Sequence, residues 1–389
     1  MPAKLLLLLS FSVVCGLAQR PPAVQSPEVH ADGSVTFRLR APDAHKVSVS
    51  IEGSKGALDM QKDEQGVWSV TSGVLAADLY GYSFEADGVH LIDPSNTAIQ
   101  PNLLNLSNVV HVPGKSTLPW EPADIPHGTI HHHFYKSNIV GDNRDYYVYT
   151  PPGYDPAAQT RYPVLYLLHG YSGDASGWTA VGKANLILDT LIAEKKAKPM
   201  LVVMPLGYGA PEIVQRTAAF GAPFRNPELR DRNFTRFRSA LIDEVIPAVE
   251  STYKVDSSRD ARAIAGLSMG GAESLFTGLN RLDKFSWVSA FSSGGPGDDF
   301  AASFPQLSEA ANQQLHLLWI ACGTEDNLVT FNRKFVDFLK GKNIRVTQIE
   351  TPGMHTWMVW RRNLIAVAPL LFQPAAPQIT SGAARPGGN

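Results

Sequence analysis

Short, almost wholly apolar segments recur along the C-terminal two thirds of the chain and alternate with segments of helical periodicity. Residues 163–168 (PVLYLL) and 200–205 (MLVVMP) carry hardly any polar side chain, as expected of parallel strands buried on both faces of a sheet. Residues 237–253 instead repeat apolar side chains on one face of a helix. We expect further strands at residues 146–150, 262–266, 287–292, 315–322 and 346–350, and further helices at residues 331–339 and 357–371. Such alternation predicts an α/β fold with a doubly wound sheet over residues 127–373.

The segment before residue 114 has a different pattern. Polar and apolar residues alternate in short runs, at residues 34–40, 46–51, 66–71 and 80–86, with Asp-Gly, Glu-Gly and Gln-Gly turns between them. Strands at this even spacing predict a small all-β sandwich over residues 25–113. Residues 114–126 are rich in proline and polar residues and are expected to link the two domains.

The first residues have the layout of a signal peptide. Residues 5–14 form an apolar run that is preceded by a lysine and is too short to span a bilayer, and small residues follow it. We predict a signal peptide over residues 1–18 that is cleaved after about Ala18, and therefore a secreted or periplasmic protein. A membrane anchor, or a lipoprotein signal at Cys15, remains the alternative.

The net charge, the cysteine content and the composition of the tail narrow the class of protein further. The formal net charge is −2, so there is no basic field that would attract nucleic acid or an anionic membrane, and no membrane span is expected. Cleavage would leave Cys322 as the single cysteine, and its apolar neighbours predict a buried core thiol. The tail over residues 374–389 is full of Pro, Ala and Gly and is predicted to be disordered.

The hexapeptide GLSMGG at residues 266–271 is the strongest chemical signal, because it follows a predicted buried strand and opens a helix. Gly266 and Gly270 permit a turn so tight that the hydroxyl of Ser268 is held out at the edge of the sheet. We predict Ser268 as a catalytic nucleophile. The alternative is a glycine-rich turn with an idle serine.

A serine hydroxyl needs a base, and that base needs an orienting acid. In α/β-hydrolases the acid and the histidine follow the serine in this order. Asp326 lies just past the strand at residues 315–322, and His355 lies in a Gly-containing loop after the last strand. We predict Asp326 and His355 as the partners of Ser268, with the adjacent Glu325 as the alternative acid. An exposed loop histidine is the alternative for His355.

The oxyanion formed when serine attacks an ester needs two backbone N–H donors. Met269 directly follows the nucleophile, and Tyr171 follows the strand that ends in His169-Gly170. We predict the N–H groups of Met269 and Tyr171 as these donors, and a structural role for His169.

Other side chains are candidates for binding. Trp178 and Trp357 lie on predicted loops at the catalytic edge and are expected either to stack on a flat acyl group or sugar ring or to cover the core. Three consecutive histidines at residues 131–133 point to alternate faces if they lie in a strand, and no acidic or cysteine partner lies at a suitable spacing. No metal site is therefore predicted.

Residues 127–373 resemble carbohydrate esterase family 1, the feruloyl esterase and esterase D group. The matching stretches are PHGTI, YVYTPPGY, PVLYLLHGYSGDASGW, LIDEVIPAVESTY, RAIAGLSMGGAESL, CGTED and GMHTWMVWRRNL. The resemblance implies an α/β-hydrolase with a Ser-Asp-His triad and no cofactor. These roles carry over to Ser268, Asp326 and His355, with Tyr171 and Met269 as oxyanion donors.

Residues 25–113 look like a family 48 carbohydrate-binding module, which has an immunoglobulin-like sandwich. The matching text is VTFRLRAPDAHKVSVS, GVWSV and YGYSFEADGVHLIDPSN. The resemblance assigns no sugar site, since Trp68 fits the core of the sandwich equally well. The alternatives for this module are to bind polysaccharide, to cap the active site, or to serve as a docking domain.

The pairing of these two domains is similar to dimodular bacterial feruloyl esterases. It implies a secreted serine esterase that removes feruloyl or acetyl groups from xylan-type polysaccharides or oligosaccharides, without cofactor or metal. Hydrolysis of a siderophore trilactone and acyl transfer to an alcohol are the alternatives with the same site. A small thioester such as S-formylglutathione is disfavoured, because that substrate is cytosolic. Alternatives of another class are a non-catalytic carbohydrate-binding protein and a scaffold that docks partners.

Overall fold

The computed structural model describes residues 23–216, 221–295, 297 and 299–373. The predicted signal peptide over residues 1–18 and the predicted disordered tail over residues 374–389 lie outside the described residues. Across the described part of the chain, no helix is both long enough and apolar enough to cross a bilayer.

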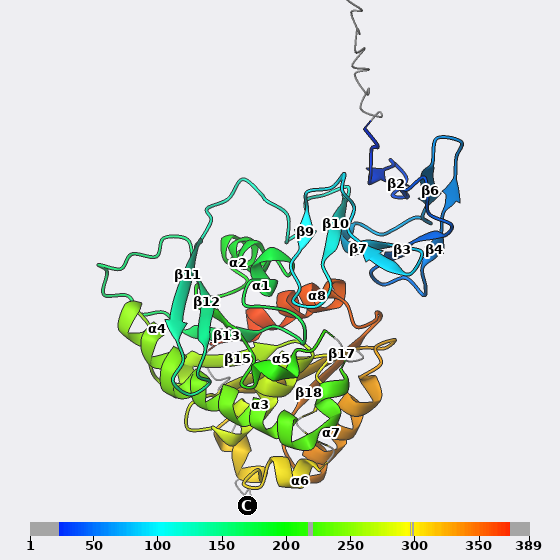
Figure 1. Ribbon diagram of the computed structural model, residues 1–389. Helices are drawn as coiled ribbons and strands as arrows, with labels where there is room; N and C mark the ends of the chain where they lie inside the picture. Colours follow the sequence, from blue (N-terminus) through cyan, green and yellow to red (C-terminus); the bar gives the residue numbers. More distant parts are fainter. Residues whose placement is uncertain (1–22, 217–220, 296, 298, 374–389) are drawn as a thin grey trace, which may run out of the picture.

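The N-terminal region is all-β and consists of two antiparallel sheets (Figure 1). The first has the order β1-β2-β6-β5, with β1 at Glu28–Val29, β2 at Val35–Arg40, β6 at Val67–Thr71 and β5 at Gln61–Lys62. The second has the order β4-β3-β7-β10-β9, with β4 at Leu58–Asp59, β3 at Val47–Ile51, β7 at Asp78–Ala86, β10 at Ser107–Val112 and β9 at Ile99–Gln100, and β8 at Val89–Leu91 pairs with β7.

One apolar core lies between these two sheets, because alternate side chains of each strand point inward. Phe37 of β2 and Tyr82 of β7 meet there with ring centroids 4.8 Å apart. Trp68 belongs to this core: it is 7% exposed, and its indole N–H donates to the carbonyl of Ala41 over 2.9 Å. The core assignment of Trp68 leaves the module without a sugar site at this residue.

The expected linker over residues 114–126 has no helix or strand, but it is not a loose tether. Trp120 within it is 4% exposed. The guanidinium groups of Arg361 and Arg362 lie 5.4 Å and 5.6 Å from the centroid of its ring. The segment is therefore packed against the last helix of the chain, which holds the two domains together.

The C-terminal domain is built on an 8-stranded sheet with the order β11-β12-β14-β13-β15-β16-β17-β18. Its first three strands pair antiparallel and the others pair parallel. The strands are β11 (Thr129–Lys136), β12 (Asn143–Thr150), β14 (Leu201–Pro205), β13 (Val164–Leu168), β15 (Arg262–Gly266), β16 (Trp287–Phe291), β17 (Leu317–Gly323) and β18 (Thr347–Thr351). The five residues of β13, β14, β15 and β16 are all buried, as their apolar sequences predict.

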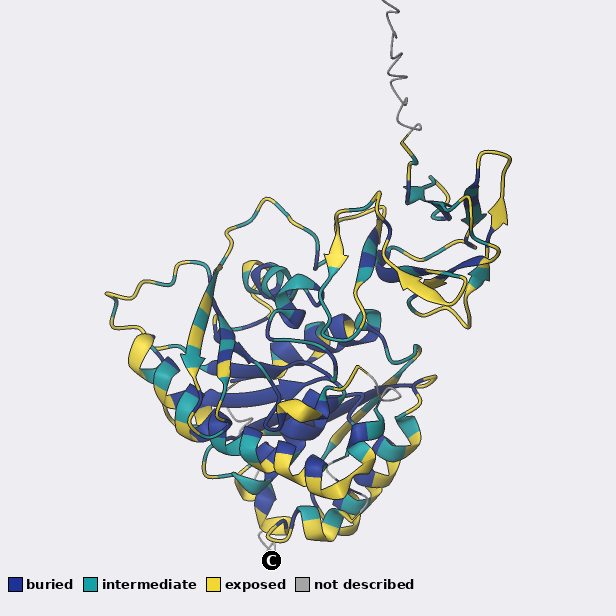
Figure 2. Cartoon of the chain, in the orientation of Figure 1, coloured by how far each residue is buried: buried dark blue, intermediate teal, exposed yellow. Residues whose placement is uncertain are grey.

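Helices cover both faces of this sheet, and each face has its own apolar core (Figures 1 and 2). One face is covered by α1 (Gly177–Ala180), α2 (Ala184–Ala193) and α8 (Trp357–Val367). The other is covered by α3 (Pro227–Ala240), α4 (Ile246–Thr252), α5 (Met269–Asn280) and α7 (Val329–Gly341). A π-helical turn η3 (Leu241–Val245) joins α3 to α4, and the short elements are α6 (Phe300–Ser303), η1 (Pro211–Ile213), η2 (Ala222–Arg225), η4 (Arg259–Ala261), η5 (Glu309–Gln313) and η6 (Ala368–Leu370).

The predicted doubly wound α/β architecture is confirmed, with some differences in the elements. The helix expected over residues 237–253 begins ten residues earlier, because Asn226 caps it by accepting the Leu229 N–H and Pro227 fits its first position. Strand β11 and helix α2 are not in the sequence-based prediction. Cys322 in β17 is 2% exposed, as predicted, and burial raises the pKa of its thiol to about 12.

This topology brings distant loops together. Strands β13, β15, β17 and β18 are mutually parallel, so the loops that follow them leave the same edge of the sheet. These four loops carry the residues predicted for the oxyanion site, the nucleophile, the acid and the histidine.

Candidate active site

Ser268 lies in a sharp turn between β15 and α5, with φ 53° and ψ −113°. A positive φ is strained for a residue with a β-carbon, and such strain is typical of functional positions. The turn closes only because its neighbours are glycines. A β-carbon at Gly266 would lie 2.4 Å from the carbonyl oxygen of Gly270, and one at Gly270 would lie 2.4 Å from that of His169.

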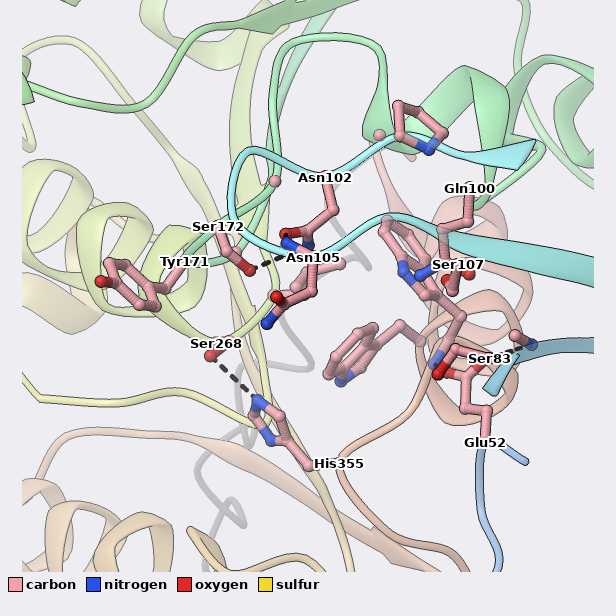
Figure 3. Close-up of a pocket in the computed structure, with 18 of the residues that line it drawn as sticks. Glu52, Ser83, Gln100, Asn102, Asn105, Ser107, Tyr171, Ser172, Ser268 and His355 are labelled. Carbon is pink, nitrogen blue, oxygen red and sulfur yellow. Dashed lines mark hydrogen bonds between the residues drawn. The ribbon is translucent and has the colours of Figure 1, made fainter. Parts of the chain in front are cut away.

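The structure brings Ser268, His355 and Asp326 into one hydrogen-bonded series, of which Figure 3 shows the contact between Ser268 and His355. Nε2 of His355 lies 3.0 Å from Oγ of Ser268, and Nδ1 lies 2.9 Å and 3.1 Å from the two carboxylate oxygens of Asp326. The convergence expected from the order of these residues in the chain is thus present in the geometry. The arrangement can pass a proton from the hydroxyl to the imidazole while the carboxylate fixes the ring.

Asp326 is placed to remain an anion. Burial pushes the pKa of its carboxyl upward, but hydrogen bonds from His355 and from the N–H of Leu328 bring that pKa below its ordinary value. Its neighbour Glu325 points elsewhere and accepts the N–H of Gly353. The geometry therefore favours Asp326 over Glu325 as the partner of His355.

The loop at residues 170–173 runs beside the nucleophile. A β-carbon at Gly170 would lie 3.2 Å from the β-carbon of Ser268. Tyr171, the predicted donor, is fixed by its side chain, whose hydroxyl donates to the carbonyl of Ile213 over 3.1 Å while the ring packs on Phe224. Met269, the other predicted donor, is the first residue of α5. Both predicted donors thus lie next to Ser268, and their role at the oxyanion stays a prediction.

His169 has the structural role that the sequence indicated. Its buried ring donates from Nδ1 to the carbonyl of Gly170, and its Nε2 accepts the N–H of Gly207 over 2.9 Å. Both ring nitrogens are therefore occupied by the backbone of adjacent loops.

A buried carboxyl group lies behind the nucleophile on α5. Glu273 is 0% exposed, and burial raises the pKa of its carboxyl well above the ordinary value, against a 3.3 Å hydrogen bond from the amide of Asn233. Burial therefore favours the uncharged form of Glu273. In that form it adds no negative charge near a site where an oxyanion has to be stabilised.

A cavity of about 440 Å³ opens onto Ser268 and His355, and the N-terminal region forms much of its wall. The polar side chains that this region contributes include Glu52, Ser83, Gln100, Asn102, Asn105 and Ser107 (Figure 3). Sequence reasoning assigned none of these residues. Asn102 and Asn105 lie in a segment that reads as a loop, but nothing local indicates that this loop docks on the other domain.

The two tryptophans predicted to bind substrate differ. Trp357 lines the cavity together with Trp360, and the Trp360 ring meets the His355 ring edge to face at 4.9 Å. Of the two roles expected for Trp178, packing in the core is confirmed and substrate binding is wrong. Helix α1 turns its side chain into the core, where it is 1% exposed and its indole N–H donates to the carbonyl of Leu168 over 2.9 Å.

This difference predicts opposite effects of alanine at the two tryptophans. Trp178→Ala should destabilise the protein by about 3–5 kcal/mol, because it removes a buried indole and leaves a cavity. Trp357→Ala should mainly raise KM for aromatic esters. Urea unfolding followed by fluorescence, together with KM for methyl ferulate, measures both effects. A raised KM with unchanged stability in Trp178→Ala would restore a binding role for Trp178.

The three histidines on β11 have protein partners. Nε2 of His132 lies 2.8 Å from a carboxylate oxygen of Asp145, and Nε2 of His133 lies 2.6 Å from the hydroxyl of Tyr253. Among the residues that the structure describes, no three His, Cys, Asp or Glu side chains are grouped as metal ligands.

Comparisons with known proteins show the family and the fold. The chain matches a family model described as "Putative esterase" over residues 137–371, more than half of its length. An endo-1,4-beta-xylanase/feruloyl esterase of Xylanibacter ruminicola is 31% identical over 359 residues, which are 90% of this chain and 46% of that protein. The chain thus spans less than half the length of this relative.

Solved structures share the fold. A CE1 ferulic acid esterase from the anaerobic fungus Anaeromyces mucronatus, in complex with ferulic acid, is 27% identical with a TM-score of 0.55, over 65% of this chain and 93% of that one. The enterobactin esterase of Shigella flexneri matches with a TM-score of 0.63 over 86% of this chain and 92% of that one. At 18% identity the latter likeness concerns the fold alone.

Proposed function

Because the chain belongs to the esterase family described by that model, we propose that it is a secreted serine esterase that removes feruloyl or acetyl groups from plant cell-wall polysaccharide. The observation that carries the esterase chemistry is the series Ser268–His355–Asp326, with separations of 3.0 Å and 2.9 Å. The substrate class rests on the relatives described as feruloyl esterases and on the composition of the cavity wall.

The geometry implies the following mechanism. Nε2 of His355 accepts the proton of Ser268 as Oγ attacks the ester carbonyl, and the N–H groups of Met269 and Tyr171 stabilise the oxyanion. The imidazolium then protonates the leaving alcohol. Water, deprotonated by His355, releases the acid from the acyl-enzyme and regenerates the serine.

The cavity suits an ester that joins a flat acid to a sugar. Trp357 and Trp360 offer aromatic surface close to the reacting atoms, and the amide and hydroxyl groups of the N-terminal region offer hydrogen bonds to sugar hydroxyls. A siderophore trilactone fits this cavity wall less well, because it has no sugar hydroxyls that would pair with these amide and hydroxyl groups.

A product assay on the purified chain tests the proposal. Ferulate release from methyl ferulate and from feruloylated arabinoxylan, or acetate release from acetylated xylan, is expected. Hydrolysis of p-nitrophenyl acetate without either of these activities would support the esterase chemistry and exclude the cell-wall substrate. A siderophore trilactone is then the substrate to assay. Acyl products on added alcohol in excess of free acid would identify a transferase. Retention on insoluble xylan without any hydrolysis would indicate a non-catalytic binding protein.

Secretion is supported by the sequence of residues 1–18 alone. Mass spectrometry of the exported protein is expected to show a mature chain that begins at Gln19. An uncleaved chain in the membrane fraction would contradict this part of the proposal.

A further inference from the structure

The N-terminal region contacts two of the loops that carry the proposed catalytic groups. One contact is made by the segment at residues 101–106, between β9 and β10. The Asn102 amide donates to Oγ of Ser172 over 2.9 Å, and the Leu103 N–H donates to the Ser172 carbonyl over 2.8 Å (Figure 3). Ser172 directly follows Tyr171, whose N–H is a proposed oxyanion donor. Two hydrogen bonds from the N-terminal region thus fix Ser172, the residue directly after that donor.

The Asn102 side chain is itself held in place. Its amide oxygen accepts the N–H of Leu104 over 2.9 Å and that of Asn105 over 3.0 Å. These bonds leave its NH₂ group to face the hydroxyl of Ser172. The contact is therefore preorganised within the N-terminal region.

The residue that receives this contact is strained. Ser172 is 4% exposed and has φ 65°, in the left-handed region that favours glycine. Such a conformation persists where surrounding contacts enforce it. Without the bonds from Asn102 and Leu103, Ser172 would be free to relax, and its relaxation would shift the loop that carries the Tyr171 N–H.

The second contact is made by Glu52, which directly follows β3. One carboxylate oxygen accepts the N–H of Trp357 over 2.7 Å, and the other accepts the N–H of Gly81 over 3.0 Å. Trp357 is the first residue of α8 and lies two positions after His355. Glu52 thus caps α8 from outside the domain, because no side chain of its own segment caps this helix.

A buried ion pair fixes α8 further along. Asp78 of β7 is 0% exposed and pairs with Arg361 over 2.7 Å and with Arg362 over 2.6 Å. Arg361 also donates to the carbonyls of Leu79 and Val181. These contacts fix α8 to the N-terminal region. Glu52 therefore holds the start of α8, and with it the adjoining His355 loop, in place.

We propose that two residues of the N-terminal region position the catalytic loops: Asn102 positions the oxyanion loop, and Glu52 positions the His355 loop. This inference rests on the proposed esterase function. It goes beyond polysaccharide binding, because it requires the region even for an ester too small to reach a sugar-binding surface.

The full-length variants Asn102→Ala and Glu52→Gln test it on p-nitrophenyl acetate. Each is expected to lower kcat and the acylation rate by about 10–100-fold, since misplacement of a reacting group by about 1 Å costs that much, while KM changes little. Glutamine at residue 52 keeps one acceptor for two N–H donors, so the fold is preserved. Thermal unfolding that matches the wild-type protein checks this.

Asn96→Ala is the matched control. Asn96 lies in the same region and donates to the Tyr82 hydroxyl and the Val109 carbonyl, neither of which belongs to a catalytic loop. Its kcat should equal that of the wild-type enzyme. A similar fall in kcat for Asn96→Ala would mean that general loosening of the domain, and not positioning, is responsible.

A double-mutant cycle isolates the Asn102–Ser172 contact. If the contact acts as inferred, Asn102→Ala has no further effect on kcat in a Ser172→Ala background. Wild-type kcat in Asn102→Ala and Glu52→Gln, with altered KM on polysaccharide only, would overturn the inference and leave a binding domain. This result is distinguishable from failure of the proposed esterase function. If the esterase function were wrong, Ser268→Ala would remain active.

Discussion

Ser268→Ala is expected to lower kcat for methyl ferulate by about 10⁵–10⁶-fold, the effect that loss of the serine has in comparable hydrolases. The alanine variant has no atom that can form the acyl-enzyme. Binding and oxyanion stabilisation remain and keep a small activity above the uncatalysed rate. Release of ferulate, followed by chromatography over hours, is a better measurement than p-nitrophenyl acetate, because that ester hydrolyses spontaneously.

Ser274→Ala is the matched control for this substitution. Ser274 lies on the same helix, is 0% exposed, and donates only to the Gly270 carbonyl over 2.7 Å. Its loss should cost about 1 kcal/mol of stability and leave kcat nearly unchanged. A fluorophosphonate should add its mass to the peptide that contains Ser268 in the wild-type and Ser274→Ala proteins, and not in Ser268→Ala. Ferulate release by Ser268→Ala at the wild-type rate would refute the nucleophile assignment.

Much of the fold and site could be predicted from the sequence because the signals involved are local. Five consecutive buried residues define a strand such as β13, and the glycines around Ser268 define the turn within six residues. The order of residues along the chain indicated His355 as the base, because parallel strands bring the loops that follow them to one edge of the sheet. Strand β11 gave no such signal: it is an edge strand with three histidines and with Phe134 77% exposed.

The errors and omissions arise where a side chain's direction depends on distant packing. Trp178 lies in a loop-like, Gly- and Ser-rich sequence, yet helix α1 turns its ring into the core. Asn102 and Glu52 read as ordinary loop and turn residues. Their partners, Ser172 and Trp357, are 70 and 305 residues away in the chain. No period or spacing encodes a contact between domains.

The sequence alone left two adjacent acids, Asp326 and Glu325, as candidates for the partner of His355. Substitution of each acid should identify the partner. Asp326→Asn is expected to lower kcat by about 10⁴-fold, because an amide cannot stabilise the imidazolium and favours the wrong tautomer of His355. Glu325→Gln should lower kcat much less, since the Glu325 side chain contacts the His355 loop at the Gly353 N–H, which a glutamine oxygen can also accept.

The pair of variants differs by one position in the chain, and both exchange a carboxylate for an amide of the same size. Steady-state kcat on methyl ferulate therefore compares only the positions of the two carboxylates. The Asp326 side chain is 0% exposed and lies 2.9 Å from His355, so the charge of this carboxylate acts on the ring without solvent between them, whereas charges in water are strongly screened. If Glu325→Gln proved the more damaging change, the orienting acid would be Glu325, and the His355 loop would have to rearrange before catalysis.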